Sequence, residues 1–417
     1  MTRSSVATES TTHLRALGPM ERFFWRYTER NPAHFLLVAE FDVELDAQRV
    51  RVALDAVQRR HPMLSAHVRD DPDHRLGFYR ADLVPSIDLN VHRDFAGDWR
   101  TLAAEELTRP FDRPAAPLIR ATLATQRTTS TLLLTFDHVI ADGISSVLVL
   151  NDLLAALNGA PGAPLPLPMS LEDLVTQALG VPGPGEAPPE ADDPRMAVPG
   201  RVRPFEGTPP HLHTLELSGE ETARLVNRCR QEQTTVHAAI VAAASRVRGR
   251  EFGEQFVRTF SPINIRKLVG QGPNCCLCIA SACTGLEPAS RTDFWTQSRD
   301  IRRELDIARS VGGLVRGSSI VEQLMPIDAD YAAAEQFLCG GLPFELMVTN
   351  LGVQDFTCSG PVRPRAVWGP IVLSQIDKEY ITGVVTYDGR LRMVCCGYTP
   401  TDGFLRGVHE MLASVGS

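Results

Sequence analysis

The stretch that decides the fold reads LLLTFDHVIADG, from Leu132 to Gly143. Its apolar start predicts a short buried strand, and the apolar residues that recur at helical spacing after Gly143 predict a helix. Side chains alternate along a strand, so His138 at the strand end shares the face of Phe136, while Asp137 points the other way. We therefore expect a strand–turn–helix unit that holds His138 against an apolar interface. Gly143 would permit backbone angles and a close approach that a side chain would forbid.

A histidine in this position is suited to general base catalysis. The ordinary pKa of imidazole, near ~6.5, leaves the ring mostly neutral at pH 7. Acyl transfer needs such a group, because a hydroxyl or amine becomes a good nucleophile only as its proton is removed. A thioester donor is already activated, so His138 would take the acceptor's proton and pass it to the departing thiolate. Asp142 is better suited to pairing with an arginine and holding the turn.

Both halves of the chain mix strand and helix patterns. In the first half, the run HFLLVAEFDVEL from His34 predicts a strand, and a helical pattern follows it as far as His61-Pro62. In the second, Thr234 or Thr235 caps a predicted helix that Gly249 ends, and Asp388-Gly389 joins a predicted hairpin. The fold class is therefore α/β.

We expect two domains, because 417 residues exceed what one core usually supports. The proline- and glycine-rich residues 181–210 lack an apolar period and are predicted to be a linker or crossover. The predicted subdomains are therefore residues 1–180, which carry the histidine motif, and residues 211–417.

Composition argues against several other classes of protein. The formal charge of -8 weakens the case for a nucleic-acid partner. No apolar run is long enough to predict a membrane span, and the first residues do not resemble an export signal. Nine cysteines at irregular spacing are then typical of reduced thiols, so we expect a cytoplasmic protein.

No cofactor or metal site is predicted. The run Cys275-Cys276-Leu277-Cys278 has no partner pair at zinc spacing, so we expect small buried residues of an apolar strand there. His211 and His213 also lack further ligands nearby in sequence. The sequence contains neither a phosphate-binding loop, a dinucleotide glycine pattern nor a Gly-x-Ser-x-Gly elbow.

The motif DHVIADG resembles the HHxxxDG signature of the condensation-domain superfamily, which includes peptide condensation domains, polyketide-associated acyltransferases and chloramphenicol acetyltransferases. Other segments along most of the chain match in the same order. They are LGPME from Leu17, RHPML from Arg60, PFD from Pro110, PLIR from Pro117, PINIR from Pro262 and TNLG from Thr349.

The resemblance implies two chloramphenicol-acetyltransferase-like subdomains in a V, with an active-site tunnel between them. It places the catalytic base at His138 and a structural aspartate at Asp142, with Arg266 as the candidate partner of that aspartate. The donor would be carried on coenzyme A or on the phosphopantetheine of an acyl carrier protein. Asn350 and Trp368 are candidate substrate-binding residues, with turn support and packing as their alternative roles.

Two departures from the family pattern stand out. The first motif histidine is Asp137 here. The superfamily also includes plant HxxxD enzymes, and their DFGWG segment is matched only in part by Val367-Trp368-Gly369-Pro370. Because strand parity turns Asp137 away from the tunnel, we expect the base to be retained while the local packing differs.

Our hypothesis is an O-acyltransferase that moves an acyl group from a thioester to a hydroxyl acceptor, in secondary-metabolite or lipid biosynthesis. An amide-forming condensation enzyme of the nonribosomal-peptide type and a degenerate, non-catalytic binding module are the alternatives. An isomerising or cyclising enzyme on the same fold is a third.

Overall fold

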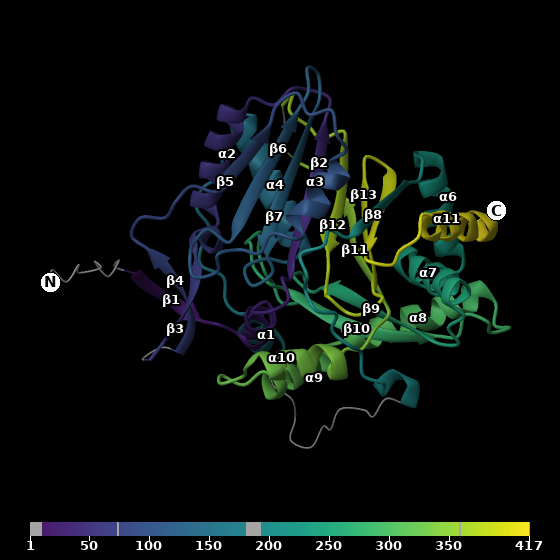
Figure 1. Cartoon of the computed structure of the whole chain (residues 1–417). Helices are drawn as coiled ribbons and strands as arrows, with labels where there is room; N and C mark the ends of the chain where they lie inside the picture. Colours follow the sequence, from purple (N-terminus) through teal and green to yellow (C-terminus); the bar gives the residue numbers. More distant parts are fainter. Residues whose placement is uncertain (1–10, 73–74, 181–192, 358–359, 417) are drawn as a thin grey trace.

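The structure is a computed structural model that describes residues 11–72, 75–180, 193–357 and 360–416. Their strands form three sheets, accompanied by helices, so the predicted α/β class is confirmed. Figure 1 shows one large sheet at the upper left and the second nearer the centre and right. The V arrangement of two subdomains stays a prediction.

The first large sheet has the order β12-β2-β7-β6-β5. Its strands are β2 (His34–Phe41), β5 (Asp88–His92), β6 (Ile119–Thr125), β7 (Ser130–Asp137) and β12 (Ala366–Val372). β2 and β7 lie at its centre and are buried along almost their whole length, which is why both are nearly continuous apolar runs. The helix α4 (Gly143–Leu157) packs against both of them and against α2 (Ala47–Arg60), whereas α3 (Trp99–Glu106) contacts β7 and the second sheet.

The second large sheet has the order β10-β9-β11-β13-β14-β8. Its strands are β8 (His211–Glu216), β9 (Val257–Asn264), β10 (Ile279–Leu286), β11 (Leu346–Gln354), β13 (Tyr380–Tyr387) and β14 (Arg390–Gly397). The helices packed around it are α6 (Gly219–Gln231), α7 (Val236–Phe252), α8 (Phe294–Arg309) and α11 (Gly403–Gly416).

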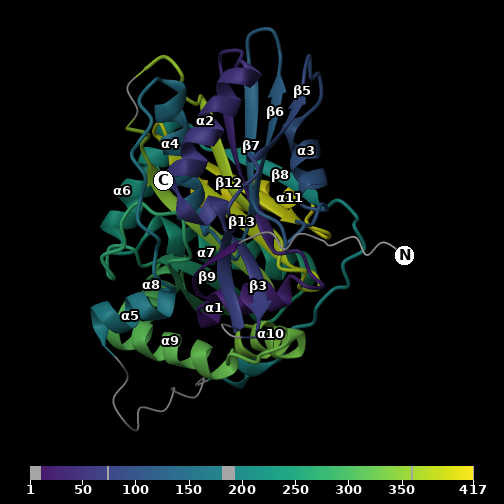
Figure 2. The ribbon, with the colours of Figure 1, turned by 90° about the vertical axis from the view of Figure 1, so that its left-hand side faces the viewer.

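A smaller sheet and a group of short helices complete the fold. The sheet has the order β1-β4-β3, with β1 (Thr11–Ala16), β3 (His67–Asp71) and β4 (Arg75–Ala81). The helices are α1 (Pro19–Tyr27), α5 (Leu171–Leu179), α9 (Val311–Leu324) and α10 (Tyr331–Gln336), followed by a π-helical turn (Phe337–Gly341). Short 3₁₀ turns cover Pro62–Ser65 and Pro194–Ala197. Figure 2 shows α1, α9 and α10 gathered at the lower end of the molecule.

Local signals in the sequence predicted several element ends. Thr235 caps α7 by accepting a hydrogen bond from the Ala238 N–H (3.1 Å), and Asp388 and Gly389 both have the positive φ that a tight hairpin requires. The predicted end of α7 at Gly249 is wrong, because the helix continues to Phe252 and Gly253, whose φ is 66°, caps it. Gly249 instead permits close packing, since a Cβ atom there would lie 2.1 Å from Pro288.

One strand of the C-terminal half joins the first sheet. β12 comes from the C-terminal half but pairs antiparallel with β2 at the edge of the first sheet. It also packs beside β13, where a Cβ atom on Gly383 would lie only 2.0 Å from the Pro370 carbonyl oxygen. The division at residues 181–210 stays a prediction, and residues 181–192 lie outside the described residues. A boundary in sequence is thus not a boundary between the two sheets.

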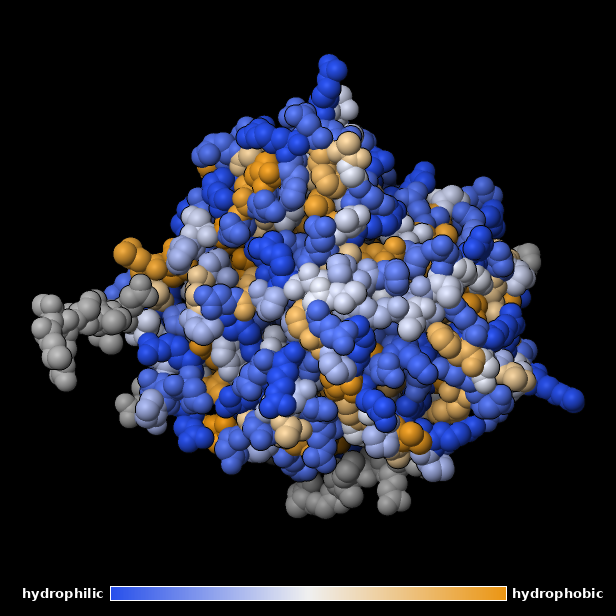
Figure 3. All heavy atoms as spheres, viewed as in Figure 1, coloured by the Kyte–Doolittle hydropathy of each residue, from blue (hydrophilic) through white to orange (hydrophobic). Residues whose placement is uncertain are grey.

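The face shown in Figure 3 is mostly hydrophilic, with scattered hydrophobic residues. Within the described residues we find no helix with the length and apolar character that crossing a membrane would need.

Candidate active site

His138 is the first residue after β7, which ends at Asp137, one residue earlier than the alternation pattern suggested. A turn follows at once. The Asp137 carboxylate accepts a hydrogen bond from the Val139 N–H (2.9 Å), and the Asp137 carbonyl accepts one from the Ile140 N–H (3.3 Å). The His138 side chain still faces the apolar interior, where it lines a cavity.

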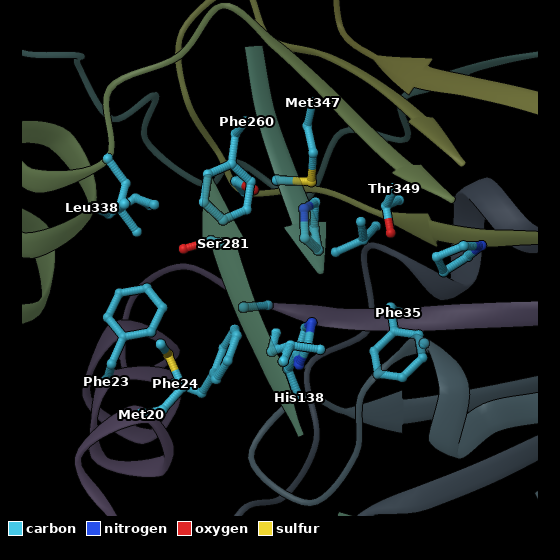
Figure 4. Close-up of a pocket in the computed structure, with 18 of the residues that line it drawn as sticks. Met20, Phe23, Phe24, Phe35, His138, Phe260, Ser281, Leu338, Met347 and Thr349 are labelled. Atoms are coloured by element: carbon cyan, nitrogen blue, oxygen red, sulfur yellow. The ribbon is translucent and has the colours of Figure 1, made fainter. Parts of the chain in front are cut away.

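This cavity, of about 120 Å³, lies between the two large sheets. One wall comes from α1, β2, His138 and the start of α4, and the opposite wall comes from β9, β10 and β11. Figure 4 shows Phe24 beside His138, with Phe260 and Met347 across the cavity. Most lining side chains are apolar, and the polar ones among the described residues are Tyr27, His138, Asn264, Ser281, Thr349, Asn350 and Ser374.

Aromatic rings hold the His138 imidazole on two sides. Phe24 from α1 stacks on it, with ring centroids 4.0 Å apart and planes inclined by 8°. Phe35 from β2 packs at a tilt of 50°, with centroids 4.9 Å apart. The imidazole Nδ1 is buried and makes no hydrogen bond within the part of the chain that the structure describes. Aromatic packing, together with hydrogen bonding to the backbone of His138 and Ala141, therefore orients this ring, without a carboxylate partner.

Burial lowers the pKa of His138 below its ordinary value. The nearby backbone of His138 and Ala141 and the charges of Asp142 and Asp137 act in the opposite direction but do not overcome it. The ring is therefore neutral at pH 7, which is the state in which an imidazole accepts a proton.

Asp142 and Arg266 form the ion pair that the resemblance suggested. The Arg266 Nη2 lies 3.1 Å from Asp142 Oδ1 and 3.2 Å from Oδ2, and both side chains are buried. Asp142 also caps α4 by accepting the Ser145 N–H (2.7 Å), and its Oδ2 accepts the Cys278 N–H (2.8 Å). One carboxylate therefore joins the turn after β7 to the loop that precedes β10.

That loop contains the cysteine run. Residues 275–278 are buried as expected, but they do not form a strand, because β10 begins only at Ile279. The backbone of Cys276 instead pairs with the Ser145 hydroxyl, which also accepts from Arg266 Nη2 (2.8 Å).

The other possible metal ligands are also dispersed. Among the described residues no group of three or more histidine, cysteine or acidic side chains could hold a metal ion. His213 pairs with Asp402, with 2.9 Å between His213 Nδ1 and Asp402 Oδ1.

Gly143 starts α4 at the cavity wall. It does not have a positive φ, so the expected need for unusual backbone angles is wrong. The expected close approach is present, because a Cβ atom there would lie 2.8 Å from the Leu351 side chain. Glycine therefore makes room for β11 beside the catalytic turn.

Asn350 combines the two roles that its sequence context suggested. Its side chain lines the cavity, and its Oδ1 accepts a hydrogen bond from the Gly352 N–H (2.8 Å), where φ is +74°. Substrate contact by Asn350 stays a prediction.

Trp368 does not lie at the cavity. Its indole N–H donates to Glu40 Oε1 (2.6 Å), and its ring packs against Trp99 with centroids 5.9 Å apart. β12 has an irregularity between Trp368 and Ile371, and the residues of this strand that line the cavity are Pro370 and Val372. The contacts of Trp368 are those of a packing residue, and substrate binding by Trp368 stays a prediction.

Asp137, the departure from the family motif, points away from the cavity toward Arg113. The Arg113 Nε lies 3.4 Å from Asp137 Oδ2, and the guanidinium stacks over the ring of Trp25 at 3.7 Å. Sequence reasoning missed both Arg113 and Phe24. Arg113 directly follows the PFD segment and Phe24 lies just after LGPME, but neither segment indicated a contact with the histidine turn.

Comparisons with known proteins identify similar sequences and similar folds. Residues 20–171 match the family model of the Condensation domain. The phosphinothricin tripeptide synthetase PhsC of Streptomyces viridochromogenes is 36% identical over 137 residues. That alignment covers 30% of this chain but only 12% of the much longer synthetase.

Solved structures share the whole fold. The polyketide synthase associated protein 5 from Mycobacterium tuberculosis has a TM-score of 0.70 at 18% identity, covering 97% of this chain and 98% of its own. The trichothecene 15-O-acetyltransferase from Fusarium sporotrichioides has a TM-score of 0.69 at 12% identity, covering 98% and 97%. At such identities the likeness concerns the fold alone.

Proposed function

We propose that this chain, whose residues 20–171 are a condensation domain by sequence and whose fold is that of condensation domains and related acyltransferases, is an O-acyltransferase. It moves an acyl group from a thioester to the hydroxyl group of a small molecule, in secondary-metabolite or lipid biosynthesis. The thioester is carried on coenzyme A or on the phosphopantetheine of an acyl carrier protein.

The observation that carries this proposal is His138, a buried imidazole with a lowered pKa that lines an apolar cavity between the two sheets. Its neutral ring accepts the proton of the acceptor hydroxyl while the oxygen attacks the thioester carbonyl. The tetrahedral intermediate then breaks its carbon–sulfur bond, and the imidazolium returns the proton to the departing thiolate. The products are an ester and a free thiol, and the histidine is neutral again.

The lining of the cavity favours an uncharged acyl group. None of the lining residues that the structure describes is acidic. An aminoacyl donor with a free ammonium group would therefore lose its hydration without gaining a counter-charge. A hydroxyl also depends on a base more than an amine does, since a neutral amine is the stronger nucleophile.

An amide-forming condensation enzyme is the second candidate. The match of residues 20–171 to the Condensation domain and the similarity to a tripeptide synthetase favour it. Purified protein offered hydroxyl and amine acceptors with acyl-coenzyme A, with thiol release followed, separates the two. Turnover only with an amine acceptor and a carrier-bound donor would refute the ester-forming proposal.

The His138→Ala variant tests the base. We expect its turnover to fall at least ~100-fold, the usual contribution of a general base. His213→Ala is the matched control, because that histidine lies on β8 away from the cavity. Full activity in His138→Ala would exclude the base assignment. An inactive wild-type protein across all donors and acceptors would instead favour the non-catalytic binding module.

A further inference from the structure

The residue before the base, Asp137, is fully buried and faces away from the cavity, with 1% of its surface exposed. Its Oδ1 shapes the turn through the Val139 N–H, which leaves Oδ2 without a hydrogen bond among the described residues. The cation that faces Oδ2 is Arg113, at 3.4 Å. A buried carboxylate in this position needs a counter-charge, so Arg113 is tied to the turn that carries His138.

Arg113 also grips α1. Its Nη1 donates a hydrogen bond to the Trp25 carbonyl (2.6 Å), and its guanidinium lies over the Trp25 indole at 3.7 Å. The planar guanidinium stacks face to face on the indole while its edge donates the hydrogen bond, whereas an ammonium group has no planar face to stack. Trp25 directly follows Phe24, the residue that stacks on His138.

The contacts therefore form a closed circuit of residues. Asp137, the neighbour of His138 in sequence, faces Arg113, and Arg113 contacts Trp25. Phe24, the neighbour of Trp25 in sequence, stacks on His138. This arrangement matters because the imidazole Nδ1 lacks the hydrogen bond that usually orients a catalytic histidine. The imidazole stacks parallel to Phe24, and Arg113 holds Trp25, the residue next to Phe24.

We propose that Arg113 is a positioning residue that acts through Phe24 to hold the His138 imidazole in its reactive orientation. This role rests on the proposed function of His138. It also explains the departure from the family motif: a carboxylate at Asp137 can recruit the arginine that braces α1 against the turn.

The test compares Arg113→Lys and Phe24→Leu with their double variant. Lysine keeps the charge but lacks the planar group that stacks on Trp25 and the paired N–H donors of the guanidinium. We expect each single variant to lower kcat on the order of 10- to 100-fold, with little change in KM, because a small displacement of a catalytic group is enough for such a loss. The double variant should be no slower than Phe24→Leu, since both changes break the same contact.

A second readout does not depend on activity. The face of the Phe24 ring shields the imidazole protons of His138, so their NMR signals, assigned by comparison with His138→Gln, should move downfield in both single variants. Arg248→Lys is the matched control, because Arg248 is also buried, paired with Glu254 and stacked over Phe252 at 4.8 Å, but lies in α7. It should lower the melting temperature without moving the His138 signals.

The two readouts separate the two proposals. If the His138 signals shift in both single variants but the wild-type protein has no acyl-transfer activity, the positioning role of Arg113 is supported and the proposed function is overturned. Unshifted His138 signals in Arg113→Lys, or independent losses of kcat in the single variants that multiply in the double variant, would overturn the role of Arg113.

Discussion

Two buried arginine–carboxylate pairs flank the turn that carries His138, and they are built differently. At the helix end, Asp142 and Arg266 meet at 3.1 Å, and the carboxylate accepts two backbone N–H groups as well. At the strand end, Asp137 and Arg113 are 3.4 Å apart, and Nε and Nη2 of Arg113 find no hydrogen bond among the described residues. The first pair makes more hydrogen bonds, although Arg266 Nε also has none among the described residues, whereas Arg113 in the second pair stacks on Trp25.

The pKa values of the two guanidiniums reflect this contrast. Burial acts to lower both, but the charges around Arg266, Asp142 foremost, outweigh it and leave the pKa of Arg266 raised. At Arg113 the charge of Asp137 does not compensate, so its pKa is lowered. Charge compensation is thus stronger at the Asp142–Arg266 pair, which joins the two sheets, than at the Asp137–Arg113 pair, which faces α1.

Breaking the Asp142–Arg266 pair should have the largest effect of the changes considered, and the effect is on the free energy of unfolding. We expect Arg266→Met to cost about 3–5 kcal/mol of unfolding free energy, because it leaves the Asp142 carboxylate buried without its cation. Urea denaturation followed by circular dichroism measures this. A loss no greater than that of Arg113→Met would show that the two pairs do not differ as their geometry indicates.

Asp137→Asn tests the Asp137–Arg113 pair at the end of β7. Its expected effect is on the pH dependence of kcat/KM. Asp137 favours the charged imidazole, so removing its charge should lower the pKa of His138 further. The neutral base then persists to lower pH. In the pH profile of kcat/KM, the acidic limb should therefore move to lower pH than in the wild type, in which burial already lowers the pKa of His138. A shift to higher pH would contradict this electrostatic coupling.

Trp368→Phe should have the smallest effect. It removes the hydrogen bond to Glu40 but keeps an aromatic ring against Trp99, at a cost of about 1 kcal/mol. Thermal denaturation and steady-state kinetics together check it, with KM expected to stay unchanged. A raised KM would restore Trp368 as a substrate-binding residue and contradict its placement outside the cavity.

Several features were predictable from sequence because short-range rules govern them. The alternation before Asp137, the Thr235 cap of α7 and the Asp388-Gly389 hairpin all depend on residues within one turn or one strand of each other. The pairing of Asp142 with Arg266 came from the family resemblance, since the two residues are 124 positions apart and no local pattern joins them.

Other features had no local signal. β12 joins a sheet built from the other half of the chain, and Arg113 reaches a carbonyl 88 residues away. The tryptophan of the VWGP segment suggested a substrate contact, but a strand irregularity turned Trp368 toward Trp99 and Glu40.

The sequence by itself determined the strand–turn–helix unit, the placement of His138 at the strand end and the α/β class, because backbone geometry and apolar period act over a few residues. Only the tertiary structure decided which side chains surround the base. Stacking by Phe24, the brace through Arg113 and the exchange of β12 depend on how distant segments pack, and packing is selected by the shape of the whole core rather than by any one stretch.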